Sequence, residues 1–112
     1  MSQKWANYSF QQIQGLEKLV NLVWLDLSFN KISKIEGLSS NTKIVDLSLA
    51  NNEIERIENL DGLTELQTLS LSNNNLSVIN DVFYLRFDVH LNSNAHAFQK
   101  ADSFPSSPFP FT

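Results

Sequence analysis

Paired carboxylates are the first feature of this chain that could support catalysis. Glu53 and Glu55, and then Glu55 and Glu58, are close enough in sequence to act together as a general acid and a general base. Carboxylate pairs of this kind usually form a solvated face. The repeat pattern described below also places them on the outer, convex side of a coil. We therefore predict no catalytic role for them.

A second group, near the C-terminus, has the residue types that bind metal ions. It consists of Asp88, His90 and His96, but the two histidines are well separated in sequence and the chain contains no cysteine. We predict no metal site there. The three glycines are not grouped as in a phosphate-binding loop, and no serine lies in a nucleophile-elbow context. The sequence therefore favours a protein that is not an enzyme and that has no cofactor and no small-molecule substrate.

The strongest pattern in the chain is structural and recurs at a constant interval. Asn30, Asn52 and Asn74 are equally spaced, each closes a phrase Leu-x-Leu-x-x-Asn, and apolar residues recur in the same register on both sides of it. A fixed period of roughly 20–29 residues with this phrase is the signature of leucine-rich repeats. Leucines two apart lie on one face of a strand. The predicted fold class is an α/β repeat, a short solenoid with a parallel concave β-sheet and 3₁₀ or irregular convex arcs.

The asparagines and glycines of the repeat are predicted to be structural. An amide side chain carries both donors and acceptors, so each Asn can satisfy backbone groups of a tight bend that would otherwise be buried without partners. Gly15, Gly37 and Gly62 fall in predicted turns, where glycine permits backbone angles that other residues resist.

The N-terminal segment is predicted to close the solenoid. Residues 1–15 form a cap or degenerate repeat, since Trp5 precedes Leu27 by the same interval that separates the asparagines. Trp5, Tyr8, Phe10 and Ile13 are expected to cover the first coil. Residues 16–85 then form three leucine-rich repeats.

The repeat pattern is lost from about residue 86. A further copy in the same period places its Asn at position 96, which is His96. One interpretation makes residues 86–112 an irregular or disordered tail rich in Pro, Phe and Ser, which leaves the strand at Leu69–Leu71 as an open edge. The other makes Phe87, Leu91 and Phe98 an irregular cap over the last coil. The sequence leaves both open.

Composition excludes several classes of partner. The net charge of −4 and the lack of a basic run argue against nucleic acid binding. No apolar run approaches the length of about 18 residues that a membrane span requires, and the polar N-terminus does not resemble a signal peptide. Without cysteines there is no disulfide framework, which favours an intracellular location.

What remains is the concave face of the predicted sheet. Side chains between the inward leucines point out of it and stack in rows about 4.8 Å apart. Trp24 and Phe29 beside Asp26 and Asp46 have the composition of a protein-binding hot spot. The alternative is that Trp24 or Phe29 packs under Trp5 or Tyr8. The predicted protein-binding residues are Val23, Trp24, Asp26, Phe29, Val45, Asp46, Ser48, Gln67 and Thr68.

Residues 16–82 resemble the intracellular 22-residue class of leucine-rich repeats, which includes regulatory subunits of a type-one protein phosphatase and several axonemal proteins. The stretches LEKLVNLVWLDLSFNKISKIEGL and DLSLANNEIERIENLDGLTELQTLSLSNNNLSVINDVFYLR are also similar to the N-terminal repeats of the third-subunit family of the nexin–dynein regulatory complex. This resemblance implies a scaffold in the axoneme of motile cilia or flagella, with other subunits of that complex as partners.

The resemblance ends near Arg86, where that family continues with further repeats, a cap and long coiled-coil helices. Two alternatives therefore stay open. One is a protein phosphatase regulatory protein, and the other is a truncated isoform without a function of its own.

Overall fold

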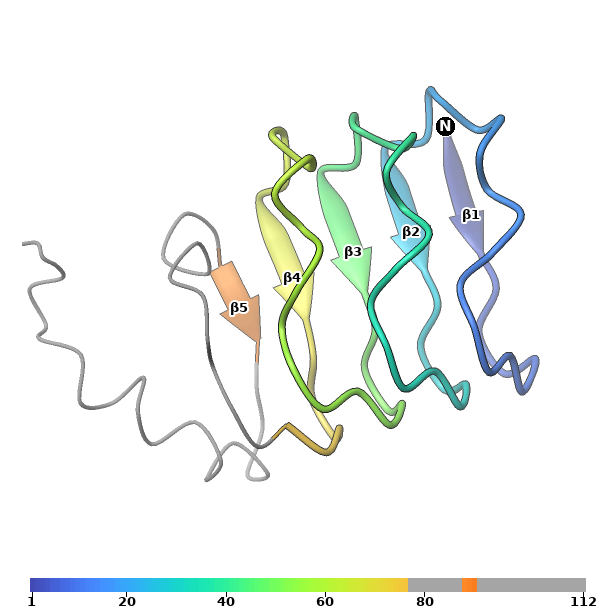
Figure 1. Ribbon diagram of the computed structural model, residues 1–112, viewed down its shortest axis with the longest axis vertical. Coiled ribbons are helices and arrows are strands. Elements are labelled where there is room, and N and C mark those ends of the chain that lie inside the picture. Colours follow the sequence, from blue (N-terminus) through green and yellow to red (C-terminus); the bar gives the residue numbers. More distant parts are fainter. Residues whose placement is uncertain (77–87, 91–112) are drawn as a thin grey trace, which may run out of the picture.

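In the part of the chain that the structure describes, five short parallel strands lie side by side in one sheet, and each belongs to one turn of the chain (Figure 1). The computed structural model describes residues 1–76 and the backbone of residues 88–90. The strands follow one another in chain order, so each connection returns to the same side of the sheet, which makes the chain a solenoid, as predicted. The strands are β1 (Ser2–Lys4), β2 (Trp24–Asp26), β3 (Asp46–Ser48), β4 (Thr68–Ser70) and β5 (Asp88–His90).

In the first four strands, residues that are one repeat period apart in sequence lie opposite one another in the sheet. Leu25 lies opposite Leu47, and Leu47 lies opposite Leu69, so each pair is one repeat period apart. The last step is different, because Leu69 lies opposite Val89, whereas a constant period would bring Leu91 to that place. The coil between β4 and β5 is therefore two residues shorter than the others.

The predicted open edge at Leu69–Leu71 is wrong, since β5 pairs with β4. The repeat pattern did not predict β5, because β5 begins two residues earlier than a constant repeat period would place it. Residues 88–90, which were expected to be irregular, are thus a strand. The other expectations for the tail concern Phe87, Leu91 and Phe98 and lie outside the described residues. The division at residues 15 and 85 stays a prediction.

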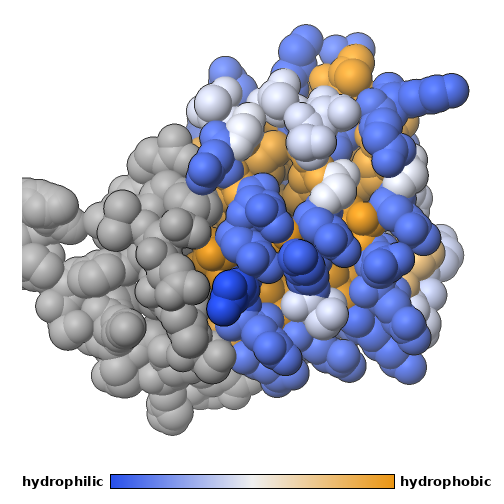
Figure 2. Space-filling view, in the orientation of Figure 1, coloured by the Kyte–Doolittle hydropathy of each residue, from blue (hydrophilic) through white to orange (hydrophobic). Residues whose placement is uncertain are grey.

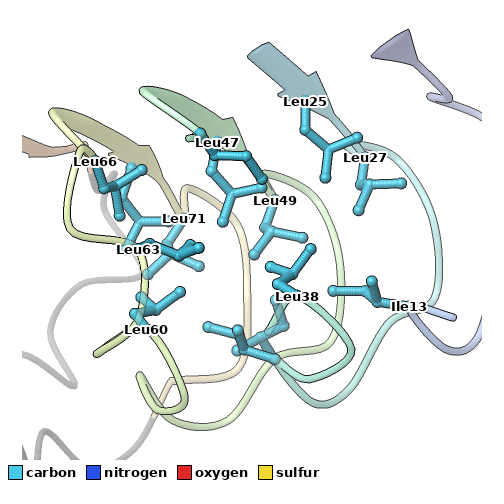
Figure 3. Packing of buried hydrophobic residues seen from close by; sticks show 14 of the residues in the cluster. Ile13, Leu25, Leu27, Leu38, Leu47, Leu49, Leu60, Leu63, Leu66 and Leu71 are labelled. Carbon is cyan, nitrogen blue, oxygen red and sulfur yellow. The ribbon is translucent and has the colours of Figure 1, made fainter. Parts of the chain in front are cut away.

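The core is a stack of leucines and isoleucines inside the coils (Figure 3). The side chains of Leu25 and Leu47 point from neighbouring strands into this interior, and Leu47 is fully buried. On the opposite side Ile32 and Ile54 are fully buried as well. Each such residue contributes roughly 1.5–3 kcal/mol of hydrophobic stabilisation. The interior of these coils is therefore filled by leucines from the strand and by isoleucines from the convex arc.

The Asn of each repeat joins its own bend to the preceding coil. Asn52 donates from Nδ2 to the carbonyl oxygens of Leu27 (3.0 Å) and Leu49 (3.1 Å), and its Oδ1 accepts from the backbone N–H of Ile32 (3.0 Å). Asn74 makes the equivalent bonds one coil later. Asn30 bonds in the same way to the N-terminal segment. The structural role predicted for these residues is confirmed.

The glycine positions of the turns are only partly as expected. Gly15, Gly37 and Asn59 occupy the same place in successive coils and all have left-handed backbones, with φ of 81°, 76° and 60°. At Gly37 a Cβ atom would collide with the carbonyl oxygen of Ile13. Gly62 has no such backbone angle, because Asn59 takes the left-handed position of that coil.

The N-terminal segment adds a strand to the sheet and covers the core with fewer side chains than predicted. Ile13 is buried and the half-buried Trp5 packs against the core. Tyr8 is exposed and does not cover the first coil, whereas Phe10 is less exposed and borders Ile13 and Leu27. The Tyr8 and Phe10 rings stack on each other, with centroids 5.4 Å apart. Tyr8 is exposed because it follows β1 at the position of the bend, where the other coils place their Asn.

The convex arcs of residues 1–76 are irregular, which is one of the two predicted forms. Single turns with hydrogen bonds between residues three apart precede the strands, as from the N–H of Leu63 to the carbonyl of Leu60. Among the described residues, no helix has the length and apolar character needed to cross a membrane.

Candidate protein-binding face

Two large aromatic side chains of the coil that contains β2 are exposed. The side chain of Trp24 is 59% exposed and that of Phe29 is 55% exposed. Neither packs beneath the N-terminal cap, so the alternative that they belong to the core is wrong. Trp5 instead takes the core position, because it lies one period before the buried Leu27.

The sheet register places polar residues in rows beside Trp24. One row runs through Ser2, Trp24, Asp46 and Thr68, and the next runs through Lys4, Asp26, Ser48 and Ser70. The two rows share one face, since their members are two residues apart along each strand. A shallow groove of about 310 Å³ lies between them. The residues that line it include Ser2, Lys4, Trp24, Asp26, Asp46 and Ser48.

The groove brings together four of the predicted residues, namely Trp24, Asp26, Asp46 and Ser48. Thr68 follows Asp46 in the same row but does not line the groove.

The other predicted residues lie just outside the strands. Val23, Val45 and Gln67 form a row directly before them, in which the N–H of each later residue bonds to the carbonyl of the one before, at 2.7 and 2.8 Å. Phe29 lies beyond the other end of β2. Of the predicted residues, four therefore line the groove, and Val23, Val45, Gln67 and Phe29 lie beyond the ends of the strands that form it.

Phe29 has a backbone conformation that suits a different residue type. Its φ is 57°, in the left-handed region, and the equivalent residues Asn7, Asn51 and Asn73 have φ between 58° and 66°. Asn tolerates this conformation, whereas a bulky side chain without local hydrogen bonding is an outlier there. The coil that contains β2 thus presents an aromatic ring at a position where the other coils have Asn.

The two carboxylates of the groove differ in their surroundings. Asp26 is held in place, since its Oδ1 accepts hydrogen bonds from the backbone N–H (2.9 Å) and the hydroxyl (2.6 Å) of Ser28. Asp26 also lies in register with Lys4. Asp46 lies between Trp24 and Thr68, and within residues 1–76 its carboxylate has no hydrogen bond or ion pair.

Sequence reasoning missed Ser2 and Lys4, which line the groove. It assigned them to a cap. The signal was nevertheless present, because a Trp5 placed one period before Leu27 also sets Ser2 opposite Trp24 and Lys4 opposite Asp26.

Of the acidic residues considered for catalysis, Glu55 and Glu58 line an open hollow on the convex side together with Lys34 and Arg56. Glu53 and Glu55 are exposed on the convex arc, as expected for a solvated face. Figure 2 shows one face of the molecule on which most described residues are hydrophilic, with apolar ones visible between them. The described part of the chain holds no group of three residues suited to a metal ion, while the side chains of Asp88, His90 and His96 lie outside it.

Comparisons with known proteins agree with this architecture. A family model described as leucine-rich repeats in two copies matches residues 20–62, and one described as leucine-rich repeat matches residues 65–85. Together they cover more than half of the chain. No curated protein sequence matches it.

Among solved structures, the chain is similar to the crystal structure of an internalin from Listeria monocytogenes, with a TM-score of 0.61 and 26% sequence identity. The similarity covers 83% of this chain but only 30% of the internalin. The chain therefore corresponds to less than a third of the length of that protein.

Proposed function

The chain belongs to the leucine-rich repeat proteins, and on that basis we propose that it binds another protein through the concave face of its sheet, as a scaffold that does no chemistry. Leucine-rich repeats are typically interaction modules. The observation that carries the proposal is the exposed Trp24, which lines a groove on that face.

Physical reasoning supports Trp24 as the centre of such an interface. Trp and Tyr are enriched among the few residues that dominate binding energy, because they bury a large apolar surface and lose little side-chain entropy. Trp24 has a polar residue opposite it on each neighbouring strand, so a partner that covers it also excludes water from those polar groups. Phe29 extends the same surface beyond the end of β2.

At a finer level, the proposed partners are other subunits of the axonemal dynein regulatory complex, and the proposed location is the cytoskeleton of a motile cilium or flagellum. The support is the sequence resemblance of residues 16–86. A cytoplasmic phosphatase regulatory role is the alternative from the same class of repeats. A truncated isoform without a function of its own is the alternative from a different class.

An affinity capture experiment on extracts of ciliated cells separates these possibilities. The bait is the full chain, since removal of residues 87–112 would also remove β5. The bait variant is Trp24→Ala, and Val20→Ala is the matched control, because Val20 is also exposed and apolar but lies outside the groove.

We expect subunits of the dynein regulatory complex to be captured by the unmodified chain and by Val20→Ala, and to be lost with Trp24→Ala. Capture of a phosphatase catalytic subunit in the same pattern supports the phosphatase alternative. If no protein depends on Trp24, the interaction proposal is wrong.

A further inference from the structure

The groove at Trp24 combines an exposed aromatic ring with carboxylates, which together suit a cationic side chain. We propose that it receives an arginine of the protein partner, whose guanidinium stacks on the Trp24 indole and pairs with the carboxylate of Asp46. This inference rests on the proposed function, because it names what the partner places in the groove.

The sheet register brings the aromatic ring and the carboxylate together. Trp24 and Asp46 are opposite one another on neighbouring strands, which places their backbones about 4.8 Å apart with both side chains on the same face. Both line the groove. A cation above the ring is therefore also within reach of the carboxylate.

The charges around the groove favour a cation. It contains two carboxylates, of Asp26 and Asp46, and one ammonium group, of Lys4. Lys4 lies in register with Asp26, while neither strand neighbour of Asp46 is basic. The chain as a whole carries a net charge of −4. Asp46 is thus the carboxylate available to a cationic group from a partner.

Arginine fits this arrangement better than other side chains. Its planar guanidinium stacks on aromatic rings and bonds to carboxylates with two parallel N–H groups, which the compact ammonium of lysine cannot do. A purely apolar side chain would remove water from Asp46 without replacing its hydrogen bonds. An acidic side chain would be repelled by both carboxylates.

The test is an NMR titration of the ¹⁵N-labelled full chain with N-acetyl-arginine-N-methylamide. The matched control probe is the citrulline analogue, which has the same shape and no charge. The chain has two tryptophans, so the indole N–H of Trp5 is an internal reference for that of Trp24. We expect the arginine probe to shift the Trp24 signal in a saturable way, with Trp5 unaffected. Equal shifts with citrulline would overturn the proposal.

Two variants test the carboxylate. Asp46→Asn should weaken binding of the arginine probe by about twofold to fivefold, the size expected for an exposed ion pair. Asp61→Asn is the matched control, because Asp61 is exposed and lies outside the groove, and it should bind like the unmodified chain.

The outcome also separates this inference from the proposed function. If capture of a cellular partner depends on Trp24 but Asp46→Asn changes neither capture nor probe binding, the scaffold role holds and the arginine assignment fails. If the arginine probe binds but no cellular protein depends on Trp24, the chemistry of the groove holds and the proposed function fails.

Discussion

Phe29 and Asn51 occupy the same position in neighbouring coils and share one backbone conformation, with φ of 57° and 58°. This conformation costs an ordinary L-residue roughly 1–2 kcal/mol, whereas Asn adopts it readily. Phe29 gains little burial in return, since it is more than half exposed. The free chain therefore contains an aromatic residue at a place where Asn stabilises the fold better.

Phe29→Asn should accordingly raise the free energy of unfolding, by about 1 kcal/mol. Chemical denaturation of the full chain measures this. The reverse change in the next coil, Asn51→Phe, is the control and should lower stability by a similar amount. A loss of stability in Phe29→Asn would show that the ring contributes to the core.

Asn41 is buried in a column that is otherwise apolar. Leu19 and Leu63 hold the equivalent positions one period before and after it. Its Nδ2 donates to the carbonyls of Leu16 (2.9 Å) and Leu19 (3.0 Å), but its Oδ1 has no partner among the described residues. Both carbonyls already accept a backbone N–H within their own turn, so they keep a partner if Asn41 is removed.

Asn41→Leu is therefore predicted to stabilise the chain, by about 1 kcal/mol, because it removes an unsatisfied acceptor and adds apolar burial. The midpoint of thermal unfolding should rise. Leu63→Asn places the same amide one coil later and should be destabilising by about 2–4 kcal/mol. A lower midpoint for Asn41→Leu would mean that the two amide bonds outweigh the unpaired oxygen.

Gly37 and Gly62 should respond to alanine in opposite ways. At Gly37 the left-handed backbone and the carbonyl of Ile13 leave no room for a Cβ, so Gly37→Ala is expected to cost about 2 kcal/mol or more. At Gly62 the space is open and the backbone is not left-handed, so Gly62→Ala should be neutral or stabilising by up to about 1 kcal/mol. Denaturation curves of the two variants check this directly. Equal losses at both sites would contradict the assignment of these turns.

The position of β5 changes which residue is expected to end the next repeat. With Val89 opposite Leu69, the sequence from Val89 onward reads Val-x-Leu-x-x-Asn and reaches Asn94, whereas a constant period leads to His96. Both residues lie outside the described part of the chain. From the spacing alone, Asn94→Ala should lower the free energy of unfolding by about 1–3 kcal/mol, and His96→Ala should change it by no more than about 0.5 kcal/mol. The opposite ranking would refute this register.

The fold of residues 16–76 could be predicted from sequence because every coil repeats the same requirements. Inward leucines, a bend held by Asn and a left-handed turn position recur at one spacing, and each copy supports the interpretation of the others. The prediction failed where that spacing changes. The shorter coil before β5 moved a strand by two residues, and Asn59 took a role that the search for glycines assigned to Gly62.

The candidate site was less accessible to sequence reasoning. Alternation within a strand identified Trp24, Asp26, Asp46 and Ser48, because side chains two apart share a face. It could not decide whether Trp24 is exposed, since that depends on what the N-terminal segment does. It also could not reveal the strain at Phe29, because φ is a property of the folded backbone and Phe is not a residue type that indicates a left-handed bend.

Trp24→Ala, compared with the unmodified chain in both partner capture and thermal unfolding, tests the central claim most directly. Because the Trp24 side chain is 59% exposed, its removal should leave the melting temperature nearly unchanged. The proteins captured by the unmodified chain should be lost from the variant. A large fall in melting temperature would show that Trp24 supports the fold, and undiminished capture by a stable variant would show that the groove is not the binding face.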